Sequence, residues 1–173
     1  MYRKKSVLDD GNTFFGYIGD FMKYTDYLIN DFNDERFQQA FRTYFTEEGM
    51  NIKNWDALFA EMNRQKDNQA FVRVNEEEEI VGFLQFQPGE MNHWFFQQPI
   101  GFIREFWIAQ PFRGQGHGSQ LLALTEEYFI KRRLARAILT ADDAEDFYLR
   151  HGYAKESCIV AKNKMKVFSK RLK

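Results

Sequence analysis

The sequence predicts an α/β domain with a mixed sheet flanked by helices, and three patterns support this. A buried strand at 100–108, a glycine-rich turn, an amphipathic run at 121–129 and a strand at 134–140 follow one another. This order is typical of a right-handed crossover between parallel strands. β-rich runs at 71–74 and 80–86 flank an acidic turn and predict an antiparallel hairpin. With 173 residues, the chain is expected to form one domain, residues 1–173, with one core.

The N-terminal part, residues 1–69, is expected to be mainly helical. Asn33 precedes an acidic pair, apolar residues then recur at helical spacing, and Gly49 ends the run, which predicts a capped amphipathic helix. A second helix is expected to begin at Asn54, since the apolar residues that follow it share one helical face.

Three further segments of the chain are less regular. Residues 26–32 favour another helix, and residues 13–18 fit either an edge strand or a loop. Residues 87–101 are expected to form an aromatic-rich loop. Its aromatic residues, together with one from the next strand, could line an acceptor pocket or belong to the core; they are Trp94, Phe95, Phe96 and Trp107.

The C-terminal part is expected to contain a short helix and a hairpin. Asp142 and Glu145 have capping-box spacing at the start of the helix, and Gly152 is expected just after its end. Residues 157–160 and 165–168 then predict two antiparallel strands.

The glycine-rich stretch at 110–119 is the main functional signal. It joins a predicted strand to a predicted helix, and its three glycines, Gly114, Gly116 and Gly118, permit positive φ and leave the backbone uncovered. Free N–H groups from Gly114 to Ser119 would then favour a phosphate at the positive end of the helix dipole. Arg113 adds a cation. The spacing differs from both the P-loop and the dinucleotide fingerprint, which weakens an ATP or NAD interpretation.

Two signatures then identify a family resemblance. Arg113, Gly116 and Gly118 form the pattern R-x-x-G-x-G after the strand residues 105–108, and residues 144–153 form A-x-x-F-Y-x-x-x-G-aromatic. Both resemble the motifs of the GNAT superfamily of acyl-CoA N-acyltransferases. The resemblance implies a centrally splayed sheet, with residues 70–173 as the acetyl-CoA-binding core and additional helices before it.

The resemblance also implies which residues would hold acetyl-CoA, the co-substrate. The Ile108 N–H or a neighbouring one would polarise the thioester carbonyl. His117 stands where the family usually has an aliphatic residue, and is interpreted as a packing variation. Asp142 and Asp143 occupy a stretch where many members carry asparagine. The implied cofactor-binding residues are Trp107, Ile108, Arg113, Gly114, Gln115, Gly116, His117, Gly118 and Ser119.

Two side chains are candidates for proton transfer. A primary alkyl amine has a pKa of about 10, so a base must take its proton near neutral pH. Glu105 is the candidate base, directly or through a water; alternatively it pairs with an arginine or binds the substrate as a carboxylate. Tyr148, which matches the signature tyrosine, is the candidate general acid for the departing thiolate. The alternative for Tyr148 is a core position.

The expected function is an acetyl-CoA-dependent N-acetyltransferase that transfers an acetyl group to a primary amine in a ternary complex. The acceptor is a small-molecule or peptide amine. Two alternatives from other classes stay open: a non-catalytic acyl-CoA-binding or regulatory module, and a protein that binds ATP or NAD.

Composition adds expectations about compartment and partners. One cysteine, Cys158, interpreted as a buried strand residue, and three histidines without ligand spacing indicate neither a disulfide nor a metal. A net charge of −1 argues against broad nucleic-acid binding. The absence of a long apolar run predicts no membrane segment and a cytoplasmic protein. A homodimer is left open.

Overall fold

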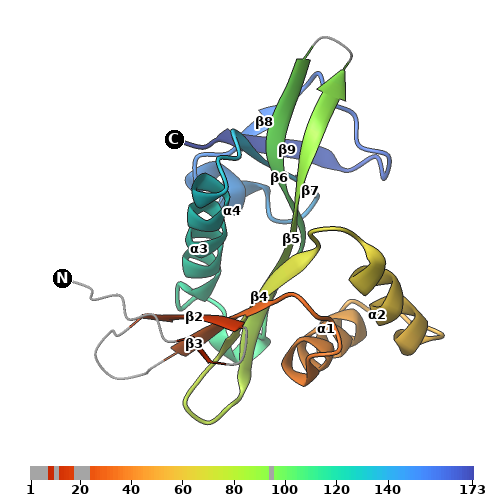
Figure 1. The fold of residues 1–173 in the computed structure, drawn as a ribbon, viewed down its shortest axis with the longest axis vertical. Coiled ribbons are helices and arrows are strands. Elements are labelled where there is room, and N and C mark those ends of the chain that lie inside the picture. Colours follow the sequence, from red (N-terminus) through yellow and green to blue (C-terminus); the bar gives the residue numbers. More distant parts are fainter. Residues whose placement is uncertain (1–7, 10–11, 18–23, 94–95) are drawn as a thin grey trace. The chain divides into compact units, whose positions relative to one another are not determined.

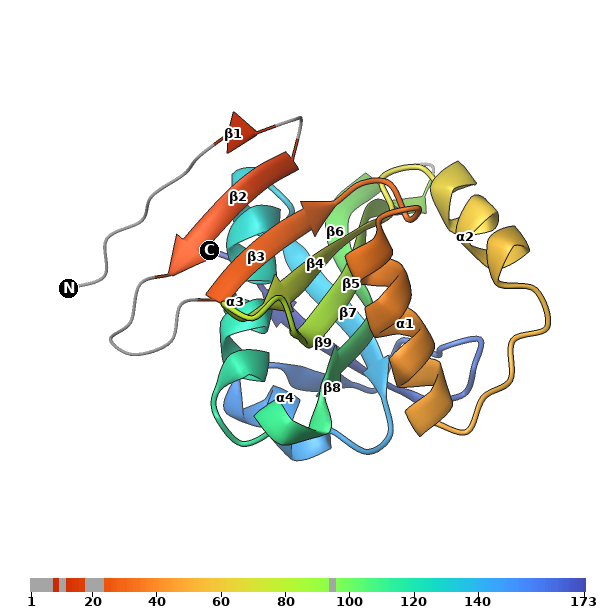
Figure 2. The ribbon, with the colours of Figure 1, turned by 90° about the horizontal axis from the view of Figure 1, so that it is seen from below.

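The structure is a computed structural model, and it describes residues 8–9, 12–17, 24–93 and 96–173 (Figures 1 and 2). Contacts divide the chain into two compact units. The first contains the residues up to Gln85 together with Glu105–Leu121, and the second contains Phe86–Arg104 and Leu122–Lys173. Three elements run from one unit into the other: β5 (Ile80–His93), β6 (Phe96–Ile108) and α3 (His117–Lys131). A single domain therefore stays a prediction.

The first unit begins with antiparallel strands. They are β1 (Leu8–Asp9), β2 (Asn12–Tyr17), β3 (Tyr24–Ile29) and β4 (Gln69–Val74). Each pairs with the next, and β5 follows β4 in the strand order. Strand β3 occupies most of the segment expected to be a helix at 26–32, so that prediction is wrong. Of the two alternatives for residues 13–18, a strand or a loop, the structure shows a strand, since β2 includes residues 13–17. Among the described residues before residue 70, strands therefore occur together with helices, and a mainly helical N-terminal part stays a prediction.

Two capped helices follow β3, as the sequence predicted: α1 (Glu35–Glu47) and α2 (Trp55–Arg64). The cap of α1 is Asp34 and not the preceding Asn33 that the sequence suggested; the Asp34 carboxylate accepts hydrogen bonds from the N–H groups of Arg36 at 3.0 Å and Phe37 at 3.3 Å. Gly49 follows the end of α1 with φ +67°. Asn54 caps α2 by accepting from the Ala57 N–H at 3.0 Å. Both views show α1 and α2 next to each other.

The core of the first unit is rich in phenylalanine. Phe37 and Phe41 of α1 contact Phe83 of β5, with ring centroids 5.6 and 5.5 Å apart. Burying one such side chain stabilises the fold by about 1.5–3 kcal/mol. The cluster takes its members from β3, α1, α2, β4, β5 and β6 and from the segment between β3 and α1, and includes Ile29, Phe32, Phe37, Ala40, Phe41, Phe59, Met62, Ala70, Val72, Val74, Phe83 and Trp107.

The second unit contains the predicted parallel crossover. β6 pairs in parallel with β7 (Arg136–Ala141), from Ile100 opposite Arg136 to Ile103 opposite Leu139. This register ends well before β6 itself does, which agrees with the expected central splay. β9 (Lys166–Arg171) pairs antiparallel with β7 and with β8 (Ala154–Glu156). The short helix α4 (Glu145–Arg150) precedes β8.

Several local predictions for the C-terminal part need correction. The N-cap of α4 is Ala144, and no side chain caps the helix, so Asp142 and Glu145 form no capping box. Gly152 does follow α4, with φ +81°. The first strand of the terminal hairpin is β8, which lies before the predicted range 157–160. Cys158 is exposed and lies outside β8, so its assignment to a buried strand is wrong.

The hairpin and the loop predicted in the middle of the chain have different outcomes. β4 and β5 flank the acidic turn as expected, and the four glutamates of that turn are exposed. Asn75 closes it by accepting hydrogen bonds from the N–H groups of Glu77 at 3.1 Å and Glu79 at 2.8 Å. Most of 87–101, in contrast, belongs to β5 and β6 and is not a loop. Trp94 and Phe95 lie outside the described residues. The mixed sheet with flanking helices confirms the α/β fold class.

Candidate active site

The glycine-rich stretch forms a tight turn between β6 and α3. A short 3-10 helix, η1 (Gln110–Phe112), leads into it. Gly114 and Gly116 have φ values of +76° and +88°, and a Cβ at either position would have no atom of the other described residues within 4 Å, apart from its chain neighbours. Glycine is therefore required here by backbone conformation and not by crowding, and the space beside the turn is open. The Gln115 side chain fastens the turn by donating to the Pro111 carbonyl at 2.9 Å.

The first turn of α3 begins directly after these glycines. The Gln120 N–H donates to the Gly116 carbonyl at 3.1 Å. The N–H groups of His117 and Gly118 precede this bond, at the end of α3 where a helix offers donors without intrahelical acceptors. The helix dipole adds positive potential at the same end. The arrangement can hold an anionic group such as a diphosphate.

Arg113 does not extend freely from the rim of the turn. Its Nε donates to the Ile108 carbonyl oxygen at 2.7 Å, and one terminal nitrogen donates to Glu47 Oε2 at 2.8 Å. The same Glu47 oxygen accepts from the Trp107 indole nitrogen at 2.8 Å. Glu47 lies in the last turn of α1. It therefore connects α1 to the first residue and to a middle residue of the segment that carries the candidate coenzyme residues.

Glu105, the candidate base, is also attached to α1. Its Oε2 accepts a hydrogen bond from the Tyr44 hydroxyl at 2.9 Å. Glu105 and Trp107 are two residues apart on β6, so both point to the same face of the strand. Tyr44 and Glu47 are three residues apart on α1, so they also share a face. Two neighbouring contacts thus fix β6 against the last turn of α1, and Glu105 is oriented by a phenol.

Tyr148, the candidate acid, belongs to the second unit. It lies on α4 and is buried, with 6% of its surface exposed. Its ring packs edge-to-face on Tyr153, with centroids 5.7 Å apart, and stacks on Phe168 at 6.3 Å. Burial and the carboxylate of Glu126 raise the pKa of Tyr153 far above its usual range, so Tyr153 keeps its proton. Both the core position and the acid role of Tyr148 are compatible with this packing.

His117 occupies a buried polar cluster that the sequence did not predict. Only 4% of its surface is exposed, and its Nδ1 lies 3.3 Å from a terminal nitrogen of Arg73 on β4. The ring also packs edge-to-face on Tyr24, with centroids 4.5 Å apart. Burial, reinforced by the Arg73 charge, lowers the pKa of His117, although Asp26 acts in the opposite direction. The packing position agrees with the interpretation of His117 as a packing variation.

Sequence reasoning missed Asp26, Tyr44, Glu47 and Arg73. For Arg73 a signal exists, because it stands alone among apolar residues in a strand, and an arginine is rarely buried without a partner. No local pattern distinguishes Tyr44 and Glu47 from other residues of α1. Asp142 and Asp143, in the stretch where asparagine was expected, are exposed.

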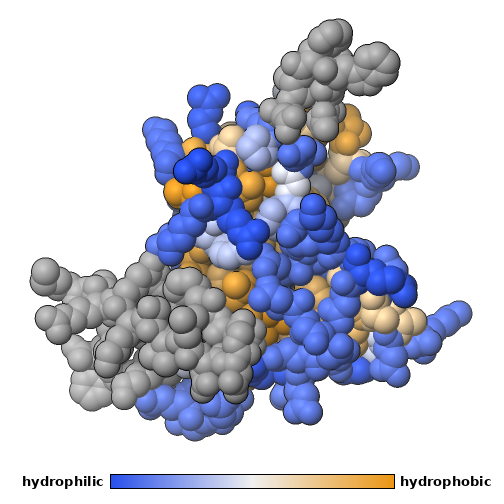
Figure 3. Space-filling view, viewed as in Figure 1, coloured by the Kyte–Doolittle hydropathy of each residue, from blue (hydrophilic) through white to orange (hydrophobic). Residues whose placement is uncertain are grey.

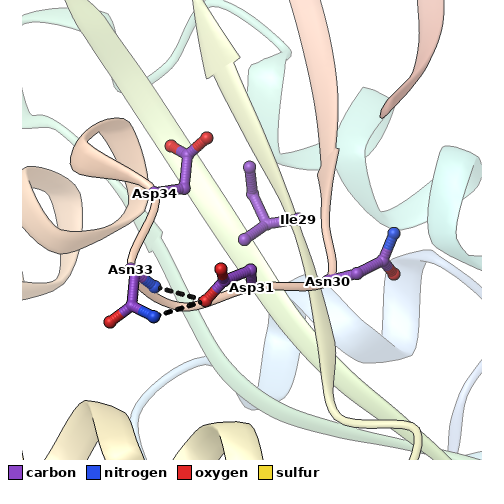
Figure 4. A pocket seen from close by; sticks show the side chains of 5 residues that line it. All are labelled: Ile29, Asn30, Asp31, Asn33 and Asp34. Carbon is purple, nitrogen blue, oxygen red and sulfur yellow. Dashed lines mark hydrogen bonds between the residues drawn. The ribbon is translucent and has the colours of Figure 1, made fainter. Parts of the chain in front are cut away.

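A separate surface depression lies between β3 and α1 (Figure 4). Its volume is about 300 Å³, and it is lined by Ile29, Asn30, Asp31, Asn33 and Asp34. Asp31 is already bonded by the backbone and side-chain nitrogens of Asn33, at 2.9 and 2.8 Å. None of the predicted site residues is among those that line it.

The described part of the chain shows no group of three or more side chains able to hold a metal ion, and no helix there is both long and apolar enough to span a membrane. Hydrophilic side chains predominate on the face shown in Figure 3.

The sequence profile of the Acetyltransferase (GNAT) family matches residues 28–153. Because this match covers more than half of the chain, the protein belongs to that family. It begins within β3 and ends just after α4, and so includes the glycine turn and both predicted signatures.

One curated relative is the aminoalkylphosphonate N-acetyltransferase of Salmonella typhimurium, 40% identical over 82 residues. The alignment covers 43% of this chain and 50% of the relative, so the chain spans about half the length of that protein.

Solved structures show the same fold. An acetyltransferase of the GNAT family from Staphylococcus aureus Mu50 matches with a TM-score of 0.63 and 14% identity, over 86% of this chain and 99% of the other. An aminoglycoside acetyltransferase from an uncultured soil metagenomic sample matches with a TM-score of 0.59 and 20% identity, over 74% and 84% of the two chains.

Proposed function

We propose that this protein is an N-acetyltransferase that transfers the acetyl group of acetyl-CoA directly to a primary amine. The observation that carries the proposal is the turn at Gly114 and Gly116, whose positive φ values and open surroundings lead into the N-terminus of a helix. That geometry suits the diphosphate of a coenzyme. Family membership and the name of the curated relative support the same reaction.

The candidate residues divide the chemistry among them. The turn and the first residues of α3 hold the coenzyme diphosphate, and the main chain around Ile108 polarises the thioester carbonyl. Such preorganised donors contribute about 3 kcal/mol each in comparable sites. Trp107 is held in place by Glu47 and supports this main-chain segment.

Glu105 and Tyr148 carry out the proton transfers in this scheme. Glu105, directly or through a water, takes a proton from the acceptor amine, whose nitrogen then forms the new bond to the acetyl carbon. The Tyr44 hydroxyl orients the Glu105 carboxylate for this step. Tyr148 donates its proton to the sulfur as the C–S bond breaks, so the coenzyme leaves as a thiol.

The acceptor is a small-molecule or peptide amine. Because the curated relative is named for aminoalkylphosphonates, we propose these as the first acceptors to assay, followed by other primary amines. The reaction needs no metal ion in this scheme, and we propose a cytoplasmic location.

Substitution of Gly116 by alanine tests the proposal through coenzyme binding. The new side chain meets a φ of +88° and fills the open space beside the turn, so we expect the Kd for acetyl-CoA, measured by isothermal titration calorimetry, to rise at least tenfold. Gly49→Ala is a matched control, because Gly49 has a φ of +67° and is also uncrowded, but it lies after α1.

Equal affinity for acetyl-CoA in the wild type, Gly116→Ala and Gly49→Ala proteins would contradict the proposed coenzyme site. Binding in the wild type without turnover of any amine would instead favour the non-catalytic acyl-CoA-binding module.

A further inference from the structure

Arg73 is a charged side chain enclosed in the first unit. All of β4 is buried, and Arg73 itself has 0% of its surface exposed. A buried charge is tolerated only when it is paired and hydrogen-bonded. Asp26 on the neighbouring strand β3 supplies the pair, accepting from Nε and from one terminal nitrogen at 2.7 Å each. The two residues face each other in the β3–β4 register.

This ion pair uses only part of the guanidinium. The other terminal nitrogen donates to the Gln120 side-chain oxygen and lies 3.3 Å from His117 Nδ1. His117 is the first residue of α3, and Gln120 lies three positions later, so both are on one face of its first turn. A single buried side chain therefore links β3 and β4 to the start of α3.

The contact between Arg73 and His117 determines which nitrogen of the neutral His117 imidazole carries the proton. A guanidinium can only donate hydrogen bonds, so Nδ1 must accept and the proton of the neutral ring is on Nε2. Nε2 is buried and has no hydrogen-bond partner among the residues that the structure describes. The edge-to-face contact with Tyr24 encloses the ring further. The side chain of the first α3 residue is thus held by one directional bond and by packing.

We propose that Arg73 is a positioning residue for the coenzyme. By holding His117 and Gln120, it fixes the first turn of α3 and, with it, the N–H groups that grip the diphosphate of acetyl-CoA. Arginine is required because its planar guanidinium can donate to Asp26 and to the first turn of α3 at the same time. A lysine ammonium cannot make these contacts in the same geometry. This inference rests on the proposed function.

The experiment must separate positioning from general stability. The two ligands are CoA and pantetheine, which lacks the diphosphate, and their Kd values are measured by calorimetry and by NMR titration. For Arg73→Lys we expect at least a tenfold rise in the Kd for CoA and no change for pantetheine. Gln120→Ala, which removes one contact near the surface, should raise the Kd for CoA about threefold.

Two further variants control for stability. Met62→Ala removes core packing on α2 in the same unit, and should lower the melting temperature while leaving both Kd values unchanged. The double variant Asp26→Leu with Arg73→Met replaces the ion pair by apolar groups, and should recover stability without recovering affinity for CoA. If this double variant does not fold, the Kd values of Arg73→Lys and Gln120→Ala for CoA and pantetheine still test the inference.

The outcomes are distinct. Wild-type affinity for CoA in both Arg73→Lys and Gln120→Ala would overturn the inference and leave the proposed function intact. Equal weakening of CoA and pantetheine, shared by Met62→Ala, would show a merely structural role and overturn it too. Failure of the wild-type protein to bind CoA would overturn the proposed function and this inference together.

Discussion

Individual residues near the glycine turn are held by partners that come from distant parts of the sequence. Tyr44 orients Glu105, Glu47 joins Trp107 to Arg113, and Asp26 neutralises Arg73. Each of these contacts joins residues about 45 or more positions apart, so no periodicity or local motif encodes them. The signatures could predict Glu105, Arg113 and Tyr148 as candidates, but not the side chains that orient them.

At this scale, the acid role of Tyr148 gives a direct prediction. Tyr148→Phe removes the hydroxyl but keeps the aromatic packing on α4, so we expect kcat for thiol release to fall by about 10²–10⁴ with the Kd for acetyl-CoA unchanged. Tyr153→Phe is the matched control, because it removes a buried hydroxyl from the adjoining ring. Unchanged thiol release in Tyr148→Phe would remove the acid assignment.

His117 predicts a dependence of stability on pH. Burial and the Arg73 charge lower its pKa in the folded protein below the usual value of 6.5, against the opposing effect of Asp26. The unfolded chain therefore binds this proton at a higher pH than the folded chain does. Stability from this residue is complete above about pH 6.5 and is lost as the pH falls towards the folded pKa.

Urea unfolding at pH 7.5, 6.5 and 5.5 measures this loss. His117→Gln should show a smaller decrease in the free energy of unfolding over this range than the wild type. Parallel curves for the wild type and His117→Gln would show that His117 does not titrate in this way.

At the scale of elements, the sequence predicted best where local rules dominate. α1 and α2 have both a cap and a periodic apolar face, and both form as expected. Residues 26–32, which include Asp26 of β3, were expected to favour a helix, and a short run cannot be assigned by periodicity alone. The aspartate is acceptable in a buried strand only because Arg73 pairs with it. That pairing depends on tertiary structure.

β8 shows a second kind of limit. The apolar residues at 157–160 favoured a strand, yet the strand lies at Ala154–Glu156. Its position follows the ladder with β9, in which Glu156 faces Val167 and Ala154 faces Ser169. Register with a partner, not the hydrophobicity of the segment, determines where a short edge strand forms.

The cap of α1 can be tested by substitution. Asp34→Ala removes the acceptor for two backbone N–H groups and the ion pair with Arg36, so we expect the free energy of unfolding to fall by about 1–2 kcal/mol. Asn33→Ala, one residue earlier, removes only an exposed side chain that donates to Asp31, and should change the free energy by less than half as much. Urea unfolding of the two variants makes the comparison, and equal losses would contradict Asp34 as the cap.

At the scale of the whole molecule, the fold class and the parallel crossover were predictable because motifs and element order are both local in sequence. The division into two units was not, since it depends on which part of β5, β6 and α3 contacts which neighbour. The candidate base lies in the first unit and the candidate acid in the second. Hydrophobic pattern alone contains no information about such a division.

Ligand binding should stabilise the whole molecule. A ligand that binds only the folded state at 100 times its Kd adds about 2.7 kcal/mol. For a chain of this length, that corresponds to a rise in melting temperature of about 5–10 °C. We expect this rise with acetyl-CoA and with CoA, but not with ATP or NAD, in a thermal-shift assay. A larger rise with ATP or NAD would favour the nucleotide-binding alternative.

The exposed thiol of Cys158 has a practical consequence for these assays. Because it is the single cysteine of the chain and is accessible, Ellman's reagent used to detect released coenzyme will also react with the enzyme, at one equivalent per molecule. A Cys158→Ser background removes this signal. The same accessibility offers one defined attachment point for a fluorescent dye, so that diffusion and ligand uptake can be followed with a uniformly labelled sample.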